Sequence, residues 1–405
     1  MRGPLSGIKV VEWAMFINGP AAACLLGDLG AEVIKVEAPI VGDAGRGLAS
    51  LYGSGMSLPS GRSIIFEVPN RNKKDVILNL KHKKGQEILH QLVKRADVFL
   101  TNFSEAVATR CGADWPTLSK VNPRIIYAST SGYGSKGPES GKRAFDTVAQ
   151  ARSGFMLSVG DRDNVEPQLV PGSMMDQAGA TTLVIGVLAA LLARNETEKG
   201  QKIEASMLGS AIALQTANVH VALWRGKPFG KHSRREPANP LGNYYCCGDG
   251  KWLLLAEPQS DRFWSELCEA VGRQDLIDDP KFNSMKKRER NSELVAILDK
   301  VFASKGRDDW VEHFASRDCR FAYSPVLSAE ELADDPQVSE NQYIIQWDHP
   351  VLGNIKTVAP PVSFSETPCG PAREAPEFGQ HTEEVLLELG YSWEEMTKLR
   401  NSGVF

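Results

Sequence analysis

The stretch GIKVVEWAMFINGPAAACLLGDLGAEVIKVEAP, residues 7–39, indicates how the first part of the chain folds. Residues 7–14 form a short apolar run that is typical of a buried strand. Residues 19–30 are expected to form a helix that Gly30 closes, and residues 31–39 are expected to form a second strand. This order predicts two parallel strands joined by a right-handed crossover.

The same alternation continues along the chain. Strands are expected at 75–80, 97–103 and 124–134, and a helix is expected at 83–96. Strands that alternate with helices over about 130 residues predict an α/β fold with a doubly wound parallel sheet. Residues 41–70 are rich in Gly, Ser and Pro and are predicted to be a long loop, which at that length is more often functional than not.

The character of the sequence changes after the apolar helix expected at 176–194. Asp249-Gly250 separates two strand-like runs, which predicts a hairpin, and amphipathic helices follow it. Residues 360–380 are Pro-rich and are expected to be a strap or linker. We therefore predict a large domain at 1–200, a linker at 201–225, a smaller α+β domain at 226–328, and a return linker with the C-terminal part of the large domain at 329–405.

Composition narrows the class of protein. The 405 residues carry a net charge of −4, with 42% hydrophobic and 24% charged residues. This profile is typical of a globular protein and disfavours nucleic acid or a membrane surface as a partner. The seven cysteines lack metal-ligand spacing, so we expect reduced thiols and no metal site. Glu12 comes too early for a secretory signal. These features predict a cytoplasmic protein.

A strand–helix–strand start raises the hypothesis of dinucleotide binding, and Glu37 stands where a ribose-binding acid would lie. The turn WAMFINGP at 13–20 lacks the G-x-G-x-x-G pattern, and the chain has no P-loop motif. A nicotinamide enzyme is therefore disfavoured. Basic residues in the α/β part are either an ordinary solvated surface or the binding site of an anionic ligand: Arg71, Lys73, Lys74, Lys81, Arg110, Lys136, Lys142 and Arg143.

Asp176 lies at the start of the long apolar helix, within VPGSMMDQAG at 170–179. An aspartate at a helix start most often accepts backbone N–H bonds as a cap. Here the neighbours are apolar, and we expect the helix dipole to keep the carboxylate ionised. An ionised carboxylate can attack a thioester as a nucleophile, which gives a mixed anhydride and a thiolate. The prediction is that Asp176 both caps the helix and carries out this chemistry.

The chain resembles the family III CoA-transferases of the CaiB/BaiF type, which include formyl-CoA:oxalate and carnitine CoA-transferases. The resemblance runs from LSGIKVVEWA at the N-terminal end through ADVFLTNF, GYGSKGP, FDTVAQARSGFM and PGSMMDQAGATTLVIGVLAALLARNETEKGQKIEASM to FGQHTEEVLLELGYSWEEMTKLRNSGVF. No single segment is specific, but their order and spacing over nearly 400 residues are.

The resemblance implies a fold, a nucleophile and a partner. It implies a large Rossmann-like domain, a small domain, and two chains threaded through each other as an interlocked dimer, either of one chain or with a related chain. It makes Asp176 the nucleophile, which would form an aspartyl anhydride and then an aspartyl-CoA thioester. Coenzyme A thioesters and free carboxylic acids are the implied substrates, with no tightly bound cofactor. The implied CoA contacts are Phe16, Leu78, Lys81, Asn102, Phe103, Arg110, Lys136 and Met207.

This chain departs from the formyl-CoA transferases at three places. Ala38 replaces an arginine, so another residue, Arg46 being the candidate, must meet the phosphates. The glycine-rich loop over the nucleophile is not recognisable at NPLGNYYCCGDGKW. Glu198 replaces a glycine in TEKG. The first two differences disfavour oxalate and formate as substrates.

The segments VPGSMMDQAG and REPANP resemble the subgroup that acts on aryl-substituted acids such as phenyllactate and benzylsuccinate. The donor expected there is an acyl-CoA such as succinyl-CoA. Apolar and aromatic side chains near the site would suit such an acid, although each could equally belong to the core: Met15, Phe16, Met174, Met175, Trp224 and Tyr244.

Two alternatives remain open within this fold. A 2-methylacyl-CoA racemase needs a proton-transfer pair, and those enzymes carry a histidine just before the aspartate of FDTVAQA. Phe145 occupies that position here and cannot move a proton. A non-catalytic subunit of a two-component transferase would bind without reacting, and the presence of Asp176 disfavours it.

Overall fold

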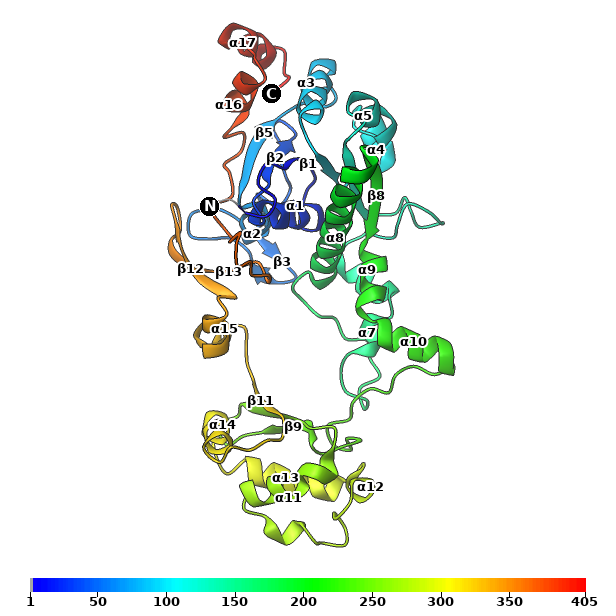
Figure 1. Cartoon of the computed structure of the whole chain (residues 1–405), viewed down its shortest axis with the longest axis vertical. Coiled ribbons are helices and arrows are strands. Elements are labelled where there is room, and N and C mark those ends of the chain that lie inside the picture. Colours follow the sequence, from blue (N-terminus) through cyan, green and yellow to red (C-terminus); the bar gives the residue numbers. More distant parts are fainter. Residues whose placement is uncertain (1–2) are drawn as a thin grey trace. The chain divides into compact units, whose positions relative to one another are not determined.

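The computed structural model describes residues 3–405 and divides the chain into two units (Figure 1). The larger unit contains the residues up to Met156 together with Leu169–Trp224 and Gln342–Phe405. At its centre lies a six-stranded sheet in the order β5-β2-β1-β6-β7-β8, and every neighbouring pair of strands is parallel. The strands are β1 (Lys9–Trp13), β2 (Glu32–Glu37), β5 (Lys73–Ile77), β6 (Val98–Thr101), β7 (Ile126–Ser131) and β8 (Gln201–Ser206).

The strand order confirms the predicted α/β fold with a parallel sheet. From β1 the chain adds strands outward in one direction, and from β6 it adds them in the other. The carboxyl ends of β1 and β6 are therefore neighbours at the point where the direction reverses. In open α/β sheets this crevice is where ligands bind.

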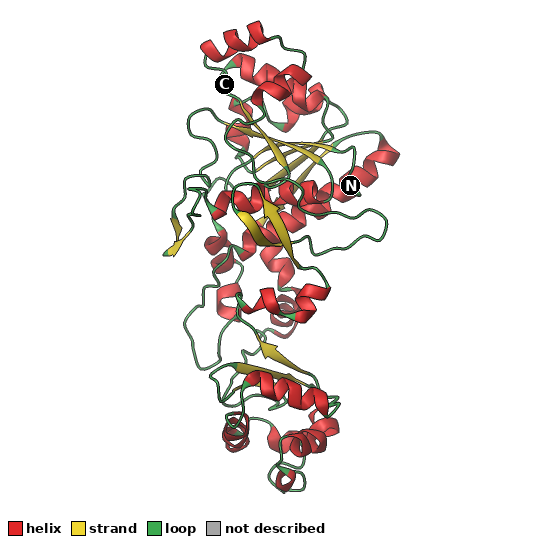
Figure 2. Cartoon of the chain, turned by 90° about the vertical axis from the view of Figure 1, so that its left-hand side faces the viewer, coloured by secondary structure: helices red, strands yellow, loops and turns green. Residues whose placement is uncertain are grey.

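Helices cover both faces of this sheet (Figure 2). On β1, Val11 and Trp13 point into one apolar cluster, whereas Val10 points into another. The helices on the first face are α3 (Lys83–Lys94), α4 (Glu105–Arg110), α5 (Trp115–Val121), α16 (Thr382–Glu388) and α17 (Trp393–Asn401). Those on the second face are α1 (Asn18–Asp28) and α8 (Met174–Thr197).

Helix α8 is long and apolar enough to cross a membrane by length and composition alone. Its position in the protein identifies it as a core helix of the α/β unit. Ala180, Leu183, Val187 and Ala190 are almost completely buried and pack with α1 and the sheet. The opposite side of the helix carries exposed apolar side chains, among them Ile185 and Leu192.

Two segments contain more regular structure than their sequences predicted. The expected loop at 41–70 holds a small hairpin, β3 (Ser50–Leu51) and β4 (Ser54–Gly55), and the helix α2 (Ile64–Asn70). The expected linker at 201–225 holds strand β8 of the main sheet, α9 (Met207–Leu214) and α10 (Thr216–Arg225). The other elements that lie wholly in the larger unit are α6 (Asp146–Arg152), β12 (Ile344–His349) and β13 (Gly353–Val358), and α7 (Phe155–Ser158) spans its boundary.

The smaller unit contains Leu157–Gln168 and Arg225–Asn341. The expected hairpin forms at Asp249-Gly250, and a third strand completes an antiparallel sheet of order β11-β10-β9. Its elements are β9 (Gly242–Cys246), β10 (Trp252–Ala256), α11 (Ser260–Ala270), η1 (Gln274–Leu276), α12 (Met285–Arg288), α13 (Ser292–Phe302), α14 (Arg307–Ser316), β11 (Tyr323–Val326), η2 (Glu331–Asp334) and α15 (Pro336–Glu340).

A network of buried charges joins three consecutive strands of the parallel sheet, β1, β2 and the edge strand β5. The Glu12 carboxylate on β1 lies 3.0 Å from the Lys35 ammonium on β2 and 2.6 Å from the Lys73 ammonium on β5. Lys35 also pairs with Asp43 at 2.9 Å. All four side chains are almost completely buried. Each charge is costly to bury alone, so the network holds together only as a set.

Glu12→Gln removes the carboxylate that two buried ammonium groups share. We expect it to lower the free energy of unfolding of the larger unit by about 3–5 kcal/mol, because Lys73 loses its only close carboxylate among the described residues. Urea denaturation followed by tryptophan fluorescence measures this.

Glu32→Gln is the matched control. Glu32 is partly exposed and pairs at 4.0 Å with Lys9 on β1 and at 3.7 Å with Lys74 on β5. This change should cost less than about 1 kcal/mol. An equal loss in both variants would contradict the importance of the buried network.

Candidate functional site

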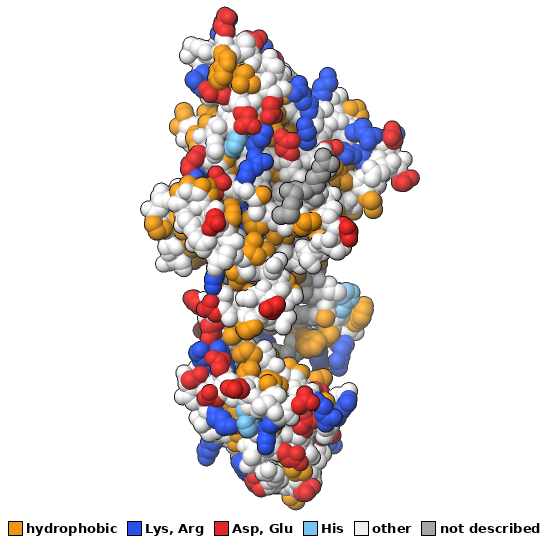
Figure 3. Space-filling model, turned by 60° about the vertical axis from the view of Figure 1, so that its left-hand side comes forward, with side chains coloured by type: hydrophobic (Ala, Val, Ile, Leu, Met, Phe, Trp, Pro, Cys, Tyr) orange, Lys and Arg blue, Asp and Glu red, His pale blue; other side chains and the backbone are white. Residues whose placement is uncertain are grey.

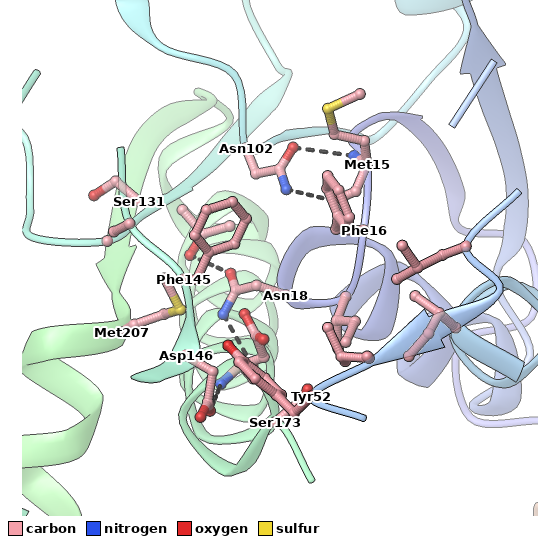
Figure 4. A pocket seen from close by; sticks show the side chains of 18 residues that line it. Met15, Phe16, Asn18, Tyr52, Asn102, Ser131, Phe145, Asp146, Ser173 and Met207 are labelled. Atoms are coloured by element: carbon pink, nitrogen blue, oxygen red, sulfur yellow. Dashed lines mark hydrogen bonds between the residues drawn. The ribbon is translucent and has the colours of Figure 1, made fainter. Parts of the chain in front are cut away.

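A cavity of about 170 Å³ opens at the carboxyl ends of β1, β6 and β7, beside the start of α8 (Figure 4). This is the crevice that the strand order predicts. Most of its lining is apolar, and its ionisable carboxyl groups are Asp146 and Asp176. The lining residues are Met15, Phe16, Ile17, Asn18, Leu48, Leu51, Tyr52, Ile65, Asn102, Thr130, Ser131, Gly132, Ala144, Phe145, Asp146, Ser173, Asp176 and Met207.

The turn after β1 is held from two sides. The Asn102 amide at the end of β6 accepts a hydrogen bond from the Met15 N–H at 3.1 Å and donates one to the Met15 carbonyl at 2.8 Å. Phe16 has a φ of 65°, a left-handed conformation that is rare for a bulky residue. Its N–H donates to Asp43 at 3.0 Å. The buried charge network therefore fixes the backbone on one wall of the cavity.

The start of α8 corrects the prediction that Asp176 caps the helix. The cap position belongs to Ser173, whose φ of 57° turns the chain into the helix, and Asp176 is the third residue of the first turn. The free N–H groups of Met175 and Asp176 instead donate to the carboxylate of Asp146, at 2.5 Å and 3.3 Å. Because another carboxylate binds the helix end, the Asp176 side chain is left facing the cavity.

The pKa of Asp176 is also opposite to the expectation. Burial, followed by the nearby charge of Asp146, raises it from an ordinary value of 3.8 to about 7. The helix dipole was expected to keep this carboxylate fully ionised. That prediction is wrong, because Asp146 already occupies the N–H groups that would have stabilised the charge. Near neutral pH, Asp176 exists in both protonation states.

Asn18 holds the backbone of Asp176 from the side of α1. Its amide donates to the Asp176 carbonyl at 2.9 Å and accepts from the Thr130 hydroxyl at 2.6 Å. This contact explains Gly179 in the middle of a helix, where glycine is normally unfavourable. A Cβ atom at position 179 would lie 2.3 Å from the Asn18 amide nitrogen.

Two further cavities adjoin the first. One of about 570 Å³ shares Thr130 and Ser131 with it and extends past Phe103 and Tyr127 toward Ser135 and Lys202. The other, of about 290 Å³, lies between the segment 51–69 and the start of α8. The central cavity is thus open to a larger ligand on two sides.

The structure gathers part of the predicted CoA-contacting set. Phe16, Asn102 and Met207 line the central cavity. Phe103 lines the 570 Å³ cavity and stacks on Trp13, with ring centroids 4.2 Å apart.

The remaining members of that set lie elsewhere. Lys81, Arg110 and Lys136 are exposed. Lys81 and Arg110 both act electrostatically on Cys111, which places their positive charges close together. Leu78 is 1% exposed in the core of the sheet and lines none of these three cavities.

The apolar residues predicted near the site are scattered. Met15 lines the cavity, and Met175 packs beneath it in a small cluster with Met207. Met174 is largely exposed, and Trp224 is 81% exposed at the end of α10. Tyr244 belongs to the smaller unit, where its ring packs against His232 and Trp252. Of this set, Met15 and Phe16 line the central cavity.

Comparison with known proteins identifies the family. The sequence model of CoA-transferase family III matches residues 5–382. The chain belongs to this family. It is 33% identical to cinnamoyl-CoA:phenyllactate CoA-transferase of Clostridium sporogenes, over 97% of this chain and 95% of that protein. It is also 33% identical to (R)-2-hydroxy-4-methylpentanoate CoA-transferase of Clostridioides difficile, over 99% of each.

A solved structure agrees with this assignment. The crystal structure of a CAIB/BAIF family protein from Brucella suis superposes with a TM-score of 0.85 at 27% identity, covering 96% of this chain and 100% of that one. The protein is therefore a CoA-transferase whose substrates are CoA thioesters.

In this CoA-transferase, Arg46 does not take the place of the missing arginine at Ala38. Its guanidinium binds the Glu37 carboxylate at 2.5 Å, donates to the Pro376 carbonyl at 3.0 Å and stacks on Phe66. These contacts occupy the side chain in holding the C-terminal segment. Glu37, considered above as a ribose-binding acid, is occupied by the same pair.

Among the residues of the CoA-transferase's cavity that sequence reasoning missed are Asn18, Tyr52 and Asp146. Asp146 stands in the FDTVAQA segment that carried the resemblance, but nothing in that segment shows that its carboxylate binds a helix 30 residues away. Tyr52 lies in a segment that the sequence predicted to be a loop, at the tip of the β3–β4 hairpin.

Asp146→Asn removes the charge next to Asp176 while leaving an oxygen for the N–H groups of α8. We expect the pKa of Asp176 to fall, so the acid limb of the pH profile of kcat/KM moves to lower pH by up to about 1 unit. Glu139→Gln, which removes a charge paired with Lys142 before α6, is the control and should leave the limb in place. An unshifted limb in Asp146→Asn would contradict the coupling of the two carboxyl groups.

Asp176→Asn tests the raised pKa through stability. A carboxyl whose pKa is higher in the folded state contributes stability below its ordinary pKa and loses it as the pH rises through the folded value, here about 7. The amide stays neutral at every pH. The variant should therefore melt at least about 2 °C above the wild type at pH 8 and equal it near pH 4. Scanning calorimetry at both pH values measures this, and a wild type that is more stable at pH 8 would refute the raised pKa.

Proposed function

We propose that this CoA-transferase moves CoA from an acyl-CoA donor to a carboxylic acid through covalent intermediates on Asp176. The observation that carries the proposal is the Asp176 carboxyl itself, which lines the cavity at the sheet's switch point with its pKa raised to about 7. Among residues 3–405, no His, Cys or Lys side chain lines that cavity. A desolvated carboxylate is a stronger nucleophile than a solvated one.

The reaction then takes four steps. The Asp176 carboxylate attacks the donor thioester carbonyl, forming a mixed anhydride and releasing CoA thiolate. The thiolate attacks the Asp176 carbonyl, giving an aspartyl-CoA thioester and freeing the donor acid. The acceptor carboxylate attacks this thioester and again displaces the thiolate. The thiolate finally attacks the acceptor's acyl carbon, which forms the product thioester and restores Asp176.

For CoA itself, we propose a path from the central cavity through the 570 Å³ cavity. Phe16, Asn102 and Met207 would contact the thioester end of the pantetheine arm, and Phe103 the arm further out. Three exposed cations would meet the phosphates. They are Lys81 just before α3, Arg110 at the end of α4 and Lys136 after β7. Leu78 remains a proposed contact through its backbone, since its side chain is buried.

For the acids, we propose an apolar acceptor. The relatives named for phenyllactate and 2-hydroxy-4-methylpentanoate support an aryl or branched acid. The same proposal includes benzylsuccinate as an acceptor and succinyl-CoA as a donor. The central cavity has apolar walls in Met15, Phe16 and Ile17. Met174, Met175 and Tyr244 are not among the residues that line this cavity, and they stay in the proposed pocket on the resemblance alone.

The racemase alternative has no observation in its favour. Racemisation needs an acid and a base on opposite sides of the substrate's α-carbon. Phe145 lines the cavity where those enzymes have a histidine, and its ring packs edge-on to Phe16 at 6.1 Å. The non-catalytic subunit is distinguished from the transferase by the experiment below.

The test is the mass of the peptide that contains Asp176 after incubation with a panel of acyl-CoA donors and trapping with hydroxylamine. An adduct confined to Asp176, and absent from Asp176→Ala, is expected. Gln177→Glu, which places a carboxylate on the next residue, is the control for position in an Asp176→Ala background and should give no adduct. Protein that binds CoA but forms no adduct with any donor would refute the nucleophile and favour a non-catalytic subunit.

We also propose that the enzyme works in the cytoplasm as an interlocked pair, either of two copies or with a related chain. Helix α10 supports this, since it has no buried residue although it carries Leu223 and Trp224. On the face shown in Figure 3, acidic and basic side chains are interspersed, which gives no support to a nucleic acid or membrane partner. The proposed strap is the Pro-rich segment 360–380.

Light scattering during size-exclusion chromatography tests the pairing. A homodimer should elute with twice the chain's mass of 44.3 kDa and keep that mass on dilution, because interlocked chains cannot separate without unfolding. A mass of 44.3 kDa at every concentration, in protein that carries out CoA transfer, would contradict the proposal.

A further inference from the structure

The cavity of about 290 Å³ is an unassigned space that shares lining residues with the central cavity, where Asp176 lies. The two cavities share a wall. Its residues come from the segment just before α1, the β3–β4 hairpin, α2 and the position just before α8. The shared residues are Ile17, Leu51, Tyr52, Ile65 and Ser173. A ligand that reaches past this wall lies in both cavities.

The first turn of α8 divides the two spaces. Asp176 lines the central cavity, whereas the next residue, Gln177, lines the neighbouring one, and Ser173 borders both. An acyl group bonded to the Asp176 carboxyl therefore starts at the boundary. Its chain needs to extend by only a few atoms to enter the second space.

The lining of the second cavity is uncharged. Apolar side chains make up most of it, and its polar groups belong to Tyr52, Ser54, Ser173 and Gln177. The apolar members are Ile17, Leu51, Met56, Ile64, Ile65, Val68, Pro69 and Pro171. In the described residues, neither cavity has a Lys, Arg or His in its lining.

The basic residues of the segment 41–70 are Arg46 and Arg62, and both form ion pairs with glutamates. Arg62 pairs with Glu67 at 2.7 Å and donates to the Ala375 carbonyl at 3.1 Å. Arg46 is held by Glu37. A carboxylate on the substrate's chain would thus gain no cation from these side chains, and it would lose part of its hydration where it lies against the apolar lining, which is unfavourable. An apolar chain gains from the same burial.

Building on the proposed function, we propose that this second cavity binds the acyl chain, and that the enzyme's acids are monocarboxylic with an aryl or branched aliphatic chain rather than dicarboxylic. The volume fits, because a dry apolar cavity of about 150 Å³ already holds a benzene molecule. Tyr52 forms the outer side of the shared wall, with its hydroxyl 3.4 Å from the Thr147 hydroxyl. The proposal narrows the broader set above, because it excludes benzylsuccinate as an acceptor and succinyl-CoA as a donor, and it also excludes other dicarboxylic acids such as glutarate.

The test compares kcat/KM for CoA transfer to 3-phenylpropanoate and 4-methylpentanoate with that for glutarate and succinate, using acetyl-CoA as donor. The two apolar acids should exceed the dicarboxylic acids by at least about 30-fold. Equal values would overturn the proposal. Acetyl-CoA has no chain to place in the second cavity, so its adduct on Asp176 reports the nucleophile separately from the acyl-chain site.

Met56→Lys places an ammonium group in the cavity on a chain of similar length. It should lower kcat/KM for 3-phenylpropanoate and raise that for glutarate, moving their ratio at least about tenfold. Met56→Leu keeps the lining apolar and should leave the ratio within about twofold.

Should Met56→Lys fail to fold, Val68→Lys at a half-exposed position of the same lining serves instead. Its control is Val362→Lys, which has nearly the same exposure, 54% against 53%, and lines neither cavity. A ratio that moves equally in Val68→Lys and Val362→Lys, or in neither, would overturn the proposal.

Discussion

The larger unit depends on the buried ion pairs that the Glu12 carboxylate forms with two lysines. Glu12 lies on the interior strand β1 and binds one ammonium group from each of the two strands on one side of it, Lys35 on β2 and Lys73 on β5. Lys35 also pairs with Asp43. The other carboxylate oxygen of Asp43 accepts a hydrogen bond from the Phe16 N–H. The order of the sheet and the shape of the active-site wall therefore rest on one chain of charge contacts.

The active site uses backbone conformations that the surroundings must hold in place. Phe16, Tyr52 and Ser173 all have positive φ angles, and all three line the central cavity. Each costs about 1–3 kcal/mol unless the surroundings compensate, and such residues gather at functional sites. Asp43 compensates at Phe16. The Asp146 carboxylate compensates at the start of α8, and in doing so it leaves Asp176 unpaired and poorly solvated.

Much of the fold followed from the sequence because its periodicities are local. The strand at β1, the helix at α1 and the strand at β2 lie where their apolar runs predicted them. The structure of the segment 41–70 was not predicted from the sequence. Helix α2 is formed by IIFEVPN, in which β-branched residues and Pro69 are unfavourable for a helix. The fold of the rest of the protein stabilises that helix, and this is not visible in a local pattern.

The site was only partly predictable for a related reason. Asp176 stands out by its position before an apolar helix, but its pKa depends on Asp146, 30 residues upstream. Arg46 was a plausible phosphate ligand until its contacts with Glu37 and the C-terminal segment were known. Contacts between distant segments decided each case.

The C-terminal helices have a consequence for the order in which this protein is completed during synthesis. Val385, Leu386, Met396 and Val404 are almost fully buried against the same face of the sheet as α3 and α5, and the Asn79 N–H donates to the Val404 carbonyl. These residues follow all six strands of the parallel sheet and the whole smaller unit in the sequence. All six strands and the complete smaller unit therefore emerge while one face of the sheet still exposes its apolar side chains. A nascent chain in that state is aggregation-prone, so residues 382–404 provide the step that covers this face of the sheet.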